Sequence, residues 1–246
     1  MRSTCKTCPV AALSLLLALS AWASGRAAQA ASKPATGPAS QPTSKPTGPT
    51  RFEARIVSFE EQNRKSPPPK DSVLFVGSSS IVMWKLDKYF PAEVKGINRG
   101  FGGSTFPDQS YYFDRVVPPV PARIVVLYCG DNDIAGGRTP QQVADDFGAF
   151  VKRVRAALPE ARLIYISIKP SLARWKLWEK TQEANKLIAA QVAKDPKLTF
   201  LDVGKDMLGP DGKPRPELFI KDGLHMNDEG YKLWTSLLAP LLKDGK

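Results

Sequence analysis

The sequence predicts an α/β fold in which a parallel sheet of five strands is covered by helices on both faces. Two observations predict it. Five short runs are apolar almost throughout and rich in β-branched or aromatic residues, which is typical of strands buried on both faces. A segment with helical periodicity separates each run from the next, so each connection can cross the sheet through a helix.

The strands are expected where the apolar runs are bounded by turn residues or charged residues. The first run is Ser-Val-Leu-Phe-Val and ends at Gly77, and the third contains Arg-Ile-Val-Val-Leu. Strands are predicted, in chain order, at residues 72–76, 94–98, 122–128, 161–168 and 198–202.

A helix is expected before the first strand, because Phe52, Ile56 and Phe59 share one face of residues 51–65 and the prolines at 67–69 end the pattern. Further helices are predicted between and after the strands, at residues 80–90, 107–116, 140–158, 174–193 and 228–242.

The first 30 residues have the pattern of an export signal. Two basic residues precede an apolar run at residues 9–23, and small residues follow it. We therefore predict a signal peptide at residues 1–30, cleaved after Ala23 or Ala30, and export to the periplasm or beyond the cell. The run is short and early for a transmembrane span, so an uncleaved anchor is less favoured and no stable membrane insertion is expected after cleavage.

Residues 31–50 are rich in Pro, Ser and Thr and predict a disordered linker, which leaves one folded domain at residues 51–246. Loss of the signal would lower the net charge from +11 to about +8, with 32 basic and 24 acidic residues. This charge suggests anionic surfaces or polymers as partners, but without basic residues interleaved with aromatics it does not favour nucleic acid. Cys129 would be the only cysteine left, which excludes an intrachain disulfide.

Function is expected at the carboxyl ends of the strands, as in other parallel sheets. Residues 77–80 (Gly-Ser-Ser-Ser) follow the first strand, and a serine between a strand and a helix is well placed as a nucleophile or as a helix cap. Ile81 stands where a Gly-x-Ser-x-Gly elbow needs its second glycine, so an α/β-hydrolase is disfavoured.

Two more segments that could take part in catalysis follow the second and third strands. The glycines of residues 98–105 let backbone amides approach a ligand, as oxyanion donors or, with less support, as a phosphate cradle. Asn132 can donate its side-chain amide to an oxyanion. The flanking Asp131 and Asp133 suggest a metal site, but no histidine or glutamate nearby completes one, so no metal is expected.

His225 is the only histidine, and Asp222 lies three residues before it. Histidine is the usual general base because its unperturbed pKa lies nearest neutrality. The spacing lets the Asp222 carboxylate reach the ring and orient it, as in a Ser-His-Asp triad, although the pair alone is a weak signal.

Four blocks in this order resemble the SGNH hydrolases, also called GDSL-type esterases, and in particular the acylhydrolase branch with the platelet-activating-factor acetylhydrolase subunits. The blocks are Gly-Ser-Ser at residues 77–79, the glycines of residues 100–103, Gly-Asp-Asn-Asp at residues 130–133 and Asp-x-x-His at residues 222–225. Ser78 stands in place of the family's aspartate.

The resemblance implies a flavodoxin-like, three-layer α/β/α fold and acyl-ester hydrolysis without a cofactor. It implies a nucleophile, a base with its orienting carboxylate, and an oxyanion hole with Gly102 as the alternative to Gly103. The residues implied are Ser79, His225 and Asp222 for the triad, and Ser79, Gly103 and Asn132 for the oxyanion hole.

The sequence therefore favours an exported serine esterase that acts on short acyl esters, acetyl above all, on a carbohydrate. No long apolar insertion suggests a lipid-binding lid. Trp84, Arg99, Arg174 and Trp175 are candidates for substrate contact, with packing against the sheet as the competing interpretation. The alternatives are a glycan- or wall-binding module without activity, a lysophospholipase-type lipid esterase and a metal-dependent phosphoesterase.

Overall fold

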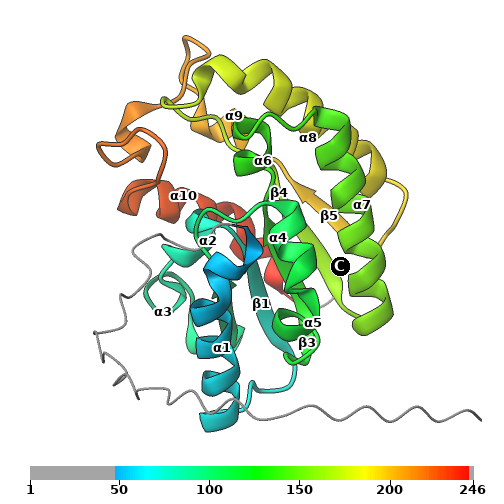
Figure 1. The fold of residues 1–246 in the computed structure, drawn as a ribbon. Coiled ribbons are helices and arrows are strands. Elements are labelled where there is room, and N and C mark those ends of the chain that lie inside the picture. The colour runs from blue at the N-terminus through cyan, green and yellow to red at the C-terminus, as the bar shows by residue number, and fades with distance from the viewer. Residues whose placement is uncertain (1–47, 244–246) are drawn as a thin grey trace, which may run out of the picture. The chain divides into compact units, whose positions relative to one another are not determined.

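The computed structural model describes residues 48–243, so the predicted signal peptide and nearly all of the predicted linker lie outside the described residues. Five strands form one parallel sheet in the order β2-β1-β3-β4-β5 (Figure 1). They are β1 (Ser72–Gly77), β2 (Gly96–Gly100), β3 (Ala122–Tyr128), β4 (Arg162–Ile166) and β5 (Leu198–Leu201). The predicted parallel sheet is confirmed.

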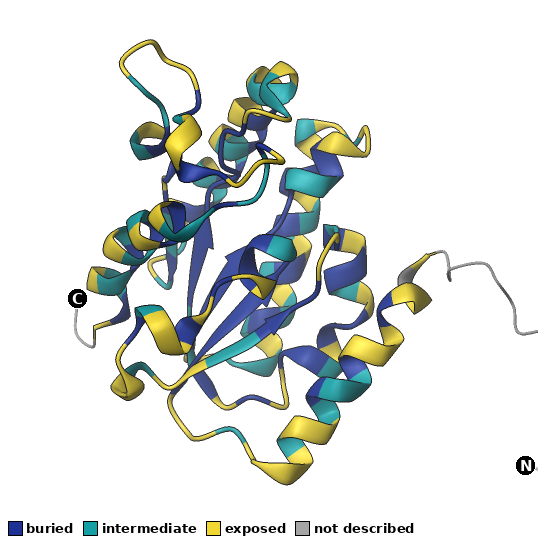
Figure 2. Cartoon of the chain, turned by 90° about the vertical axis from the view of Figure 1, so that its left-hand side faces the viewer, coloured by how far each residue is buried: buried dark blue, intermediate teal, exposed yellow. Residues whose placement is uncertain are grey.

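Helices cover both faces of the sheet. One face packs against α1 (Glu53–Lys65), α4 (Phe106–Tyr111), α5 (Phe113–Val116), α7 (Pro140–Ala157) and α8 (Trp178–Val192). The other packs against α2 (Ser79–Val82), α3 (Leu86–Tyr89), α9 (Gly204–Met207) and α10 (Asp228–Leu238). Figure 2 shows the strands dark blue between helices whose outer surfaces are yellow, so the molecule has the predicted three layers. Among residues 48–243, no helix is long and apolar enough to cross a membrane.

The longest helix, α7, shows how local sequence and packing agree. Thr139 caps its first turn by accepting a hydrogen bond from the Gln142 amide, and Pro140 occupies the first helical position, where its missing N–H costs nothing. Val143, Phe147, Phe150 and Val154 then recur at intervals of three or four residues and are all buried. The helix therefore buries one continuous apolar stripe against the sheet.

Two predicted helices are interrupted, and others carry a 3₁₀ turn at one end. Residues 80–90 form α2 and α3 in place of one helix. At the break, the Asn98 side-chain amide donates to the carbonyls of Ile81 (2.6 Å) and Trp84 (3.2 Å), which satisfies two carbonyls that a continuous helix would have paired. Residues 107–116 form α4 and α5, and residues 174–193 begin as a 3₁₀ helix at Trp175–Leu177. The short helices α6 (Asp131–Ala135) and α9 were not predicted, since each is too short for periodicity to show.

The strand order places a topological switch at the centre of the sheet. The chain leaves β1 toward β2 on one side and then crosses to β3 on the other side. Open α/β sheets bind ligands at such a switch point, beyond the carboxyl ends of the strands, so a site is expected between the loops that follow β1 and β3. The serine block follows β1 and the Gly-Asp-Asn-Asp block follows β3.

Candidate active site

Ser79 is the first residue of α2, directly after β1. Gly77 has a φ of +140°, and a Cβ there would lie 2.0 Å from the Tyr128 carbonyl oxygen, so only glycine lets β1 approach β3 so closely. The Ser78 amide donates to that carbonyl at 3.2 Å. Ser78 and Ser80 are buried, whereas Ser79 is half-buried. The turn therefore presents the middle one of the three serines.

His225 lies in the loop that precedes α10 and reaches across to Ser79. Its Nε2 lies 2.9 Å from the Ser79 Oγ, and its Nδ1 lies 2.6 Å from the Asp222 Oδ2. The structure thus brings together three residues that the sequence spreads over 147 positions, from 79 to 225. A hydroxyl, an imidazole and a carboxylate form one hydrogen-bonded chain, which is the arrangement of a serine triad.

Asp222 uses its two oxygens for two tasks. Its Oδ1 accepts the backbone amides of Leu224 and His225, both at 2.9 Å, and its Oδ2 accepts the His225 ring N–H. The hydrogen bond from His225 lowers the pKa of Asp222 to about 2. Because an ionised carboxylate only accepts hydrogen bonds, Nδ1 must carry the proton, and Nε2 is left free to accept from Ser79.

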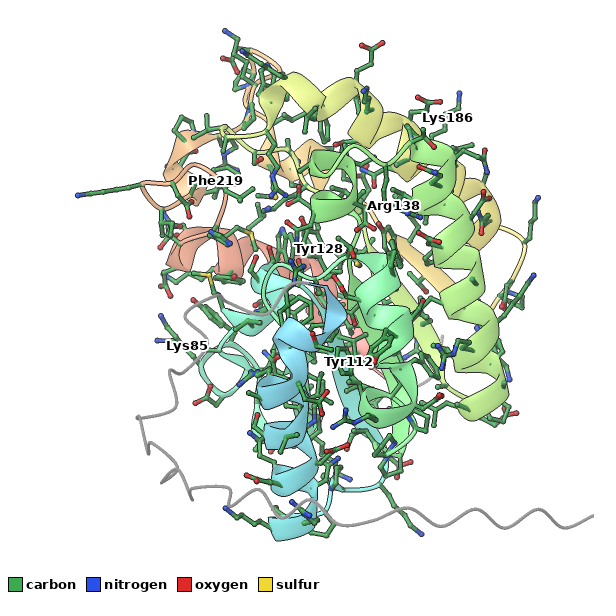
Figure 3. The ribbon with its side chains drawn as sticks, in the orientation of Figure 1. Lys85, Tyr112, Tyr128, Arg138, Lys186 and Phe219 are labelled. Carbon is green, nitrogen blue, oxygen red and sulfur yellow. The ribbon has the colours of Figure 1, made fainter. Side chains whose placement is uncertain are left out.

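The loop that carries His225 is anchored by Asn227, the N-cap of α10. Its Oδ1 accepts the Gly230 amide at 3.1 Å, and its Nδ2 donates to the carbonyls of Glu217 (2.8 Å) and Phe219 (3.3 Å). Figure 3 shows Phe219 in this segment. One side chain thus joins the start of α10 to the chain that leads into the histidine block.

Asn132 lies in α6, and hydrogen bonds hold both ends of its side-chain amide. Its Nδ2 donates to the Ser104 carbonyl at 3.0 Å, and its Oδ1 accepts from Nη2 of Arg174 at 3.0 Å. A Cβ on Gly102 would lie 3.7 Å from that of Ser79, whereas Gly103, with φ of +80°, would meet nothing within 4 Å. The glycine loop therefore lies beside Ser79, and the choice of Gly103 over Gly102 stays a prediction.

Asp133, the last residue of the Gly-Asp-Asn-Asp block, is buried and holds the start of α4 in place. Its Oδ1 accepts the Phe106 amide at 3.0 Å, at the start of α4. Burial raises the pKa of Asp133 to about 6, against the opposing effects of that hydrogen bond and of Arg138, which Figure 3 shows between α6 and α7. Within residues 48–243, no group of three or more His, Cys, Asp or Glu side chains could hold a metal ion.

Two of the four predicted substrate contacts are wrong. Trp84 is 1% exposed and packs against the rings of Phe90, Tyr231 and Trp234. Arg99 is 6% exposed and faces α1, where its guanidinium donates to side-chain oxygens. Both side chains stabilise the packing of helices on the sheet, so neither is available to a substrate.

Arg174 and Trp175 lie nearer the predicted site. Arg174 contacts Asn132 and also pairs with Asp131, with 2.6 Å between Nη1 and Oδ1. Trp175 is half-buried and stacks on Trp178, with ring centroids 5.9 Å apart. A contact of Trp175 with substrate therefore stays a prediction, whereas Arg174 contacts Asn132, the predicted oxyanion donor.

Lys169 is a residue near the site that the sequence did not reveal. Its side chain is 1% exposed, and its Nζ lies 3.4 Å from the Asp131 Oδ2 and 3.3 Å from the Tyr128 hydroxyl. Burial lowers the pKa of Lys169. A lone lysine after a strand is usually solvated, so its sequence gives no sign of burial. The only signal available was that the carboxyl ends of β3 and β4 lie side by side, which brings Lys169 close to Asp131.

Comparison with known proteins agrees with this geometry. Residues 78–233 match the sequence profile of the GDSL-like Lipase/Acylhydrolase family. Platelet-activating factor acetylhydrolase IB subunit alpha1 from Pongo abelii is 26% identical over 183 residues, which cover 72% of this chain and 78% of the relative.

Two solved structures resemble the fold. A GDSL-like lipase from Bacteroides thetaiotaomicron has a TM-score of 0.64 and 22% identity, over 77% of this chain and 97% of the other. A carbohydrate esterase family 3 protein from Talaromyces cellulolyticus has a TM-score of 0.57 and 17% identity, over 72% of this chain and 100% of the other. With the profile match covering more than half of the chain, the protein belongs to the GDSL-like lipase/acylhydrolase family and is a carboxylic ester hydrolase.

Proposed function

We propose that the protein is an exported serine esterase that hydrolyses short acyl esters, chiefly acetyl esters on carbohydrate, with Ser79, His225 and Asp222 as its triad. The observation that carries the triad is the unbroken pair of hydrogen bonds from the Ser79 Oγ to His225 and from His225 to Asp222. A binding module without activity has no use for this alignment, so a catalytic role is favoured.

The residues perform the reaction in two halves. His225 Nε2 takes the Ser79 proton while the Ser79 oxygen bonds to the ester carbonyl carbon, which gives a tetrahedral oxyanion. The amides of Ser79 and Gly103 and the Asn132 Nδ2 hold that oxyanion. His225 then protonates the departing alcohol as the carbon–oxygen bond breaks. His225 then deprotonates a water molecule, which attacks the acyl-enzyme. As the bond between the acyl carbon and the Ser79 oxygen breaks, His225 returns the proton to that oxygen and the acid is released.

Replacement of Asn132 by alanine should lower kcat about 100- to 1000-fold with little change in KM, since this donor meets charge that exists only in the transition state. Steady-state kinetics on 4-nitrophenyl acetate would measure both constants. A change confined to KM would instead make Asn132 a substrate-binding residue.

Three features support short esters on carbohydrate. The curated relatives are by name acetylhydrolases, and a protein of the same fold is by name a carbohydrate esterase. The half-buried pair Trp175 and Trp178 begins directly after Arg174, which contacts Asn132, so its rings can provide a wall for a sugar near the site. Export through the predicted signal would bring the enzyme to polysaccharides.

A lipid esterase is the second candidate, because two apolar side chains lie exposed beside the histidine block. Leu172 and Ile220 are each 42% exposed. The Ile220 amide donates to the His225 carbonyl, and the Ala173 amide, next to Leu172, donates to that of Gly223. An acyl chain could lie across both side chains.

Two substrate series separate the candidates. With 4-nitrophenyl esters from acetate to laurate, kcat/KM should be highest for acetate and fall with chain length. Acetylated xylan and acetylated peptidoglycan should release acetate, and a phospholipid should release no fatty acid. The opposite result in both series would replace the carbohydrate esterase by a lipid esterase, and detection of the full-length chain in the cytoplasm alone would contradict export.

A further inference from the structure

We infer that Arg174 is a positioning residue that fixes the oxyanion donor Asn132, and that the buried pair of Asp131 and Lys169 holds Arg174 in place. The inference rests on the proposed role of Asn132. It reassigns Arg174 from a substrate contact to the enzyme's own machinery.

A continuous set of contacts leads from the protein interior to the donor. The Lys169 ammonium lies 3.4 Å from the Asp131 Oδ2, and Nη1 of Arg174 lies 2.6 Å from the Asp131 Oδ1. Nη2 of the same guanidinium donates to the Asn132 Oδ1 at 3.0 Å. One planar guanidinium thus bridges a carboxylate and an amide oxygen, which a lysine in the same place could not do.

The bridge determines which way the Asn132 amide points. Its Nδ2 already donates one hydrogen to the Ser104 carbonyl at 3.0 Å, while Arg174 donates to its Oδ1. A flipped amide would set its NH₂ against the guanidinium and its oxygen against that carbonyl, with repulsion at both ends. The amide is therefore locked with its second Nδ2 hydrogen free for the oxyanion, and it need not reorient when the oxyanion forms.

The charges in this cluster fix the position of Arg174. Two cations, Lys169 and Arg174, share the single carboxylate of Asp131, and the side chains of these residues are 1%, 23% and 12% exposed. Burial alone would raise the pKa of Asp131, but the two cations outweigh it and lower that pKa, so the carboxylate stays ionised. The Asp222 carboxylate also acts on Lys169 and opposes the lowering of its pKa, so two carboxylates face the two basic groups and the cluster serves to hold the Arg174 guanidinium beside Asn132.

A double-mutant cycle with Arg174→Ala and Asn132→Ala tests the inference. Arg174→Ala should lower kcat on 4-nitrophenyl acetate roughly 10- to 100-fold with KM nearly unchanged, the range expected for loss of a hydrogen bond from a charged group. In the Asn132→Ala background the same change should have almost no further effect, because the residue it positions is gone. Arg174→Lys keeps the positive charge but not the planar guanidinium that bridges the two oxygens, so it should recover only part of the lost kcat.

Arg155→Ala is the matched control. Arg155 is also 23% exposed and ion-paired, with Asp195, but it lies by Ala161 at the amino end of β4, away from the site. Arg155→Ala should lower the midpoint of thermal unfolding about as much as Arg174→Ala and leave kcat unchanged.

The outcomes separate this inference from the proposed function. Fully additive effects of the two alanine variants, full recovery of kcat with lysine, or an effect of Arg174→Ala on KM alone would overturn the positioning role while Asn132 remained a donor. If Asn132→Ala itself left kcat unchanged, the proposed oxyanion hole would fail instead.

Discussion

Ser79→Ala is expected to lower kcat/KM about a million-fold, the loss that follows removal of the serine from a triad. The physical reason is that no other hydroxyl can replace it: Ser79 alone of the three serines is half-buried and within 2.9 Å of His225. Because the variant loses only one hydroxyl at the surface of the site, its thermal unfolding midpoint should match that of the wild type.

Ser78→Ala and Ser80→Ala are the matched controls, since they remove the neighbouring hydroxyls from the same turn. Both should retain most of the activity. A serine-directed organophosphonate should label Ser79 in the wild type and in both controls, and peptide mass spectrometry would locate the adduct. Label on another residue, or full turnover by Ser79→Ala, would refute the assignment of the nucleophile.

His225→Gln is expected to lower kcat about as far as loss of the serine, because the two act as one unit. In the wild type, kcat/KM should fall as the pH is lowered, since a protonated imidazole cannot accept the Ser79 proton. Asp222 cannot cause this fall, because its pKa is lowered to about 2 and it stays ionised throughout. A pH–rate profile of the purified enzyme measures the acid limb.

One other group, Asp133, changes its protonation state in the acidic pH range and needs its own control. The pKa of Asp133 is raised to about 6, so Asp133 becomes protonated as the pH falls through that value. A raised pKa also means that this group favours the folded state most at pH below about 4 and that this contribution is lost as the pH rises through 6. Asp133→Asn should therefore flatten that stability trend and keep the acid limb of activity. Disappearance of the limb in Asp133→Asn would assign it to Asp133 and contradict the role of His225.

The strands and the main helices followed from the sequence because burial leaves a direct signal there. A strand covered on both faces must be apolar at almost every position, and α7 must repeat its apolar residues with helical spacing. The candidates for the triad came from the order of the four blocks and the resemblance that they carry. The structure brings Ser79, His225 and Asp222 into one hydrogen-bonded chain, and their catalytic role stays a prediction.

The wrong predictions came from features that depend on which face a side chain occupies. Arg99 lies beside a functional block in the sequence, yet alternation along β2 turns it toward α1. There its guanidinium lies over the Phe59 ring and donates to a polar side chain. Lys169 and Arg174 were not recognised as a cluster, since their meeting with Asp131 depends on how the loops after β3 and β4 fold over one another. Such contacts between separate loops have no periodic signature in a single sequence.

The burial of Trp84 has a consequence for the precision of catalysis. Ser79 and His225 come from distant parts of the chain, and Trp84 joins the elements next to them: it follows α2, and its indole N–H donates to Thr235 in α10 at 3.2 Å. The Tyr231 hydroxyl donates from α10 to the Ser80 carbonyl at 3.0 Å, next to Ser79, the proposed nucleophile. These aromatic side chains act as a spacer that sets how far apart the two reacting groups stand. Since a displacement of about 1 Å can cost on the order of 100-fold in rate, a substitution that shortens Trp84 should lower activity even where the sheet stays folded.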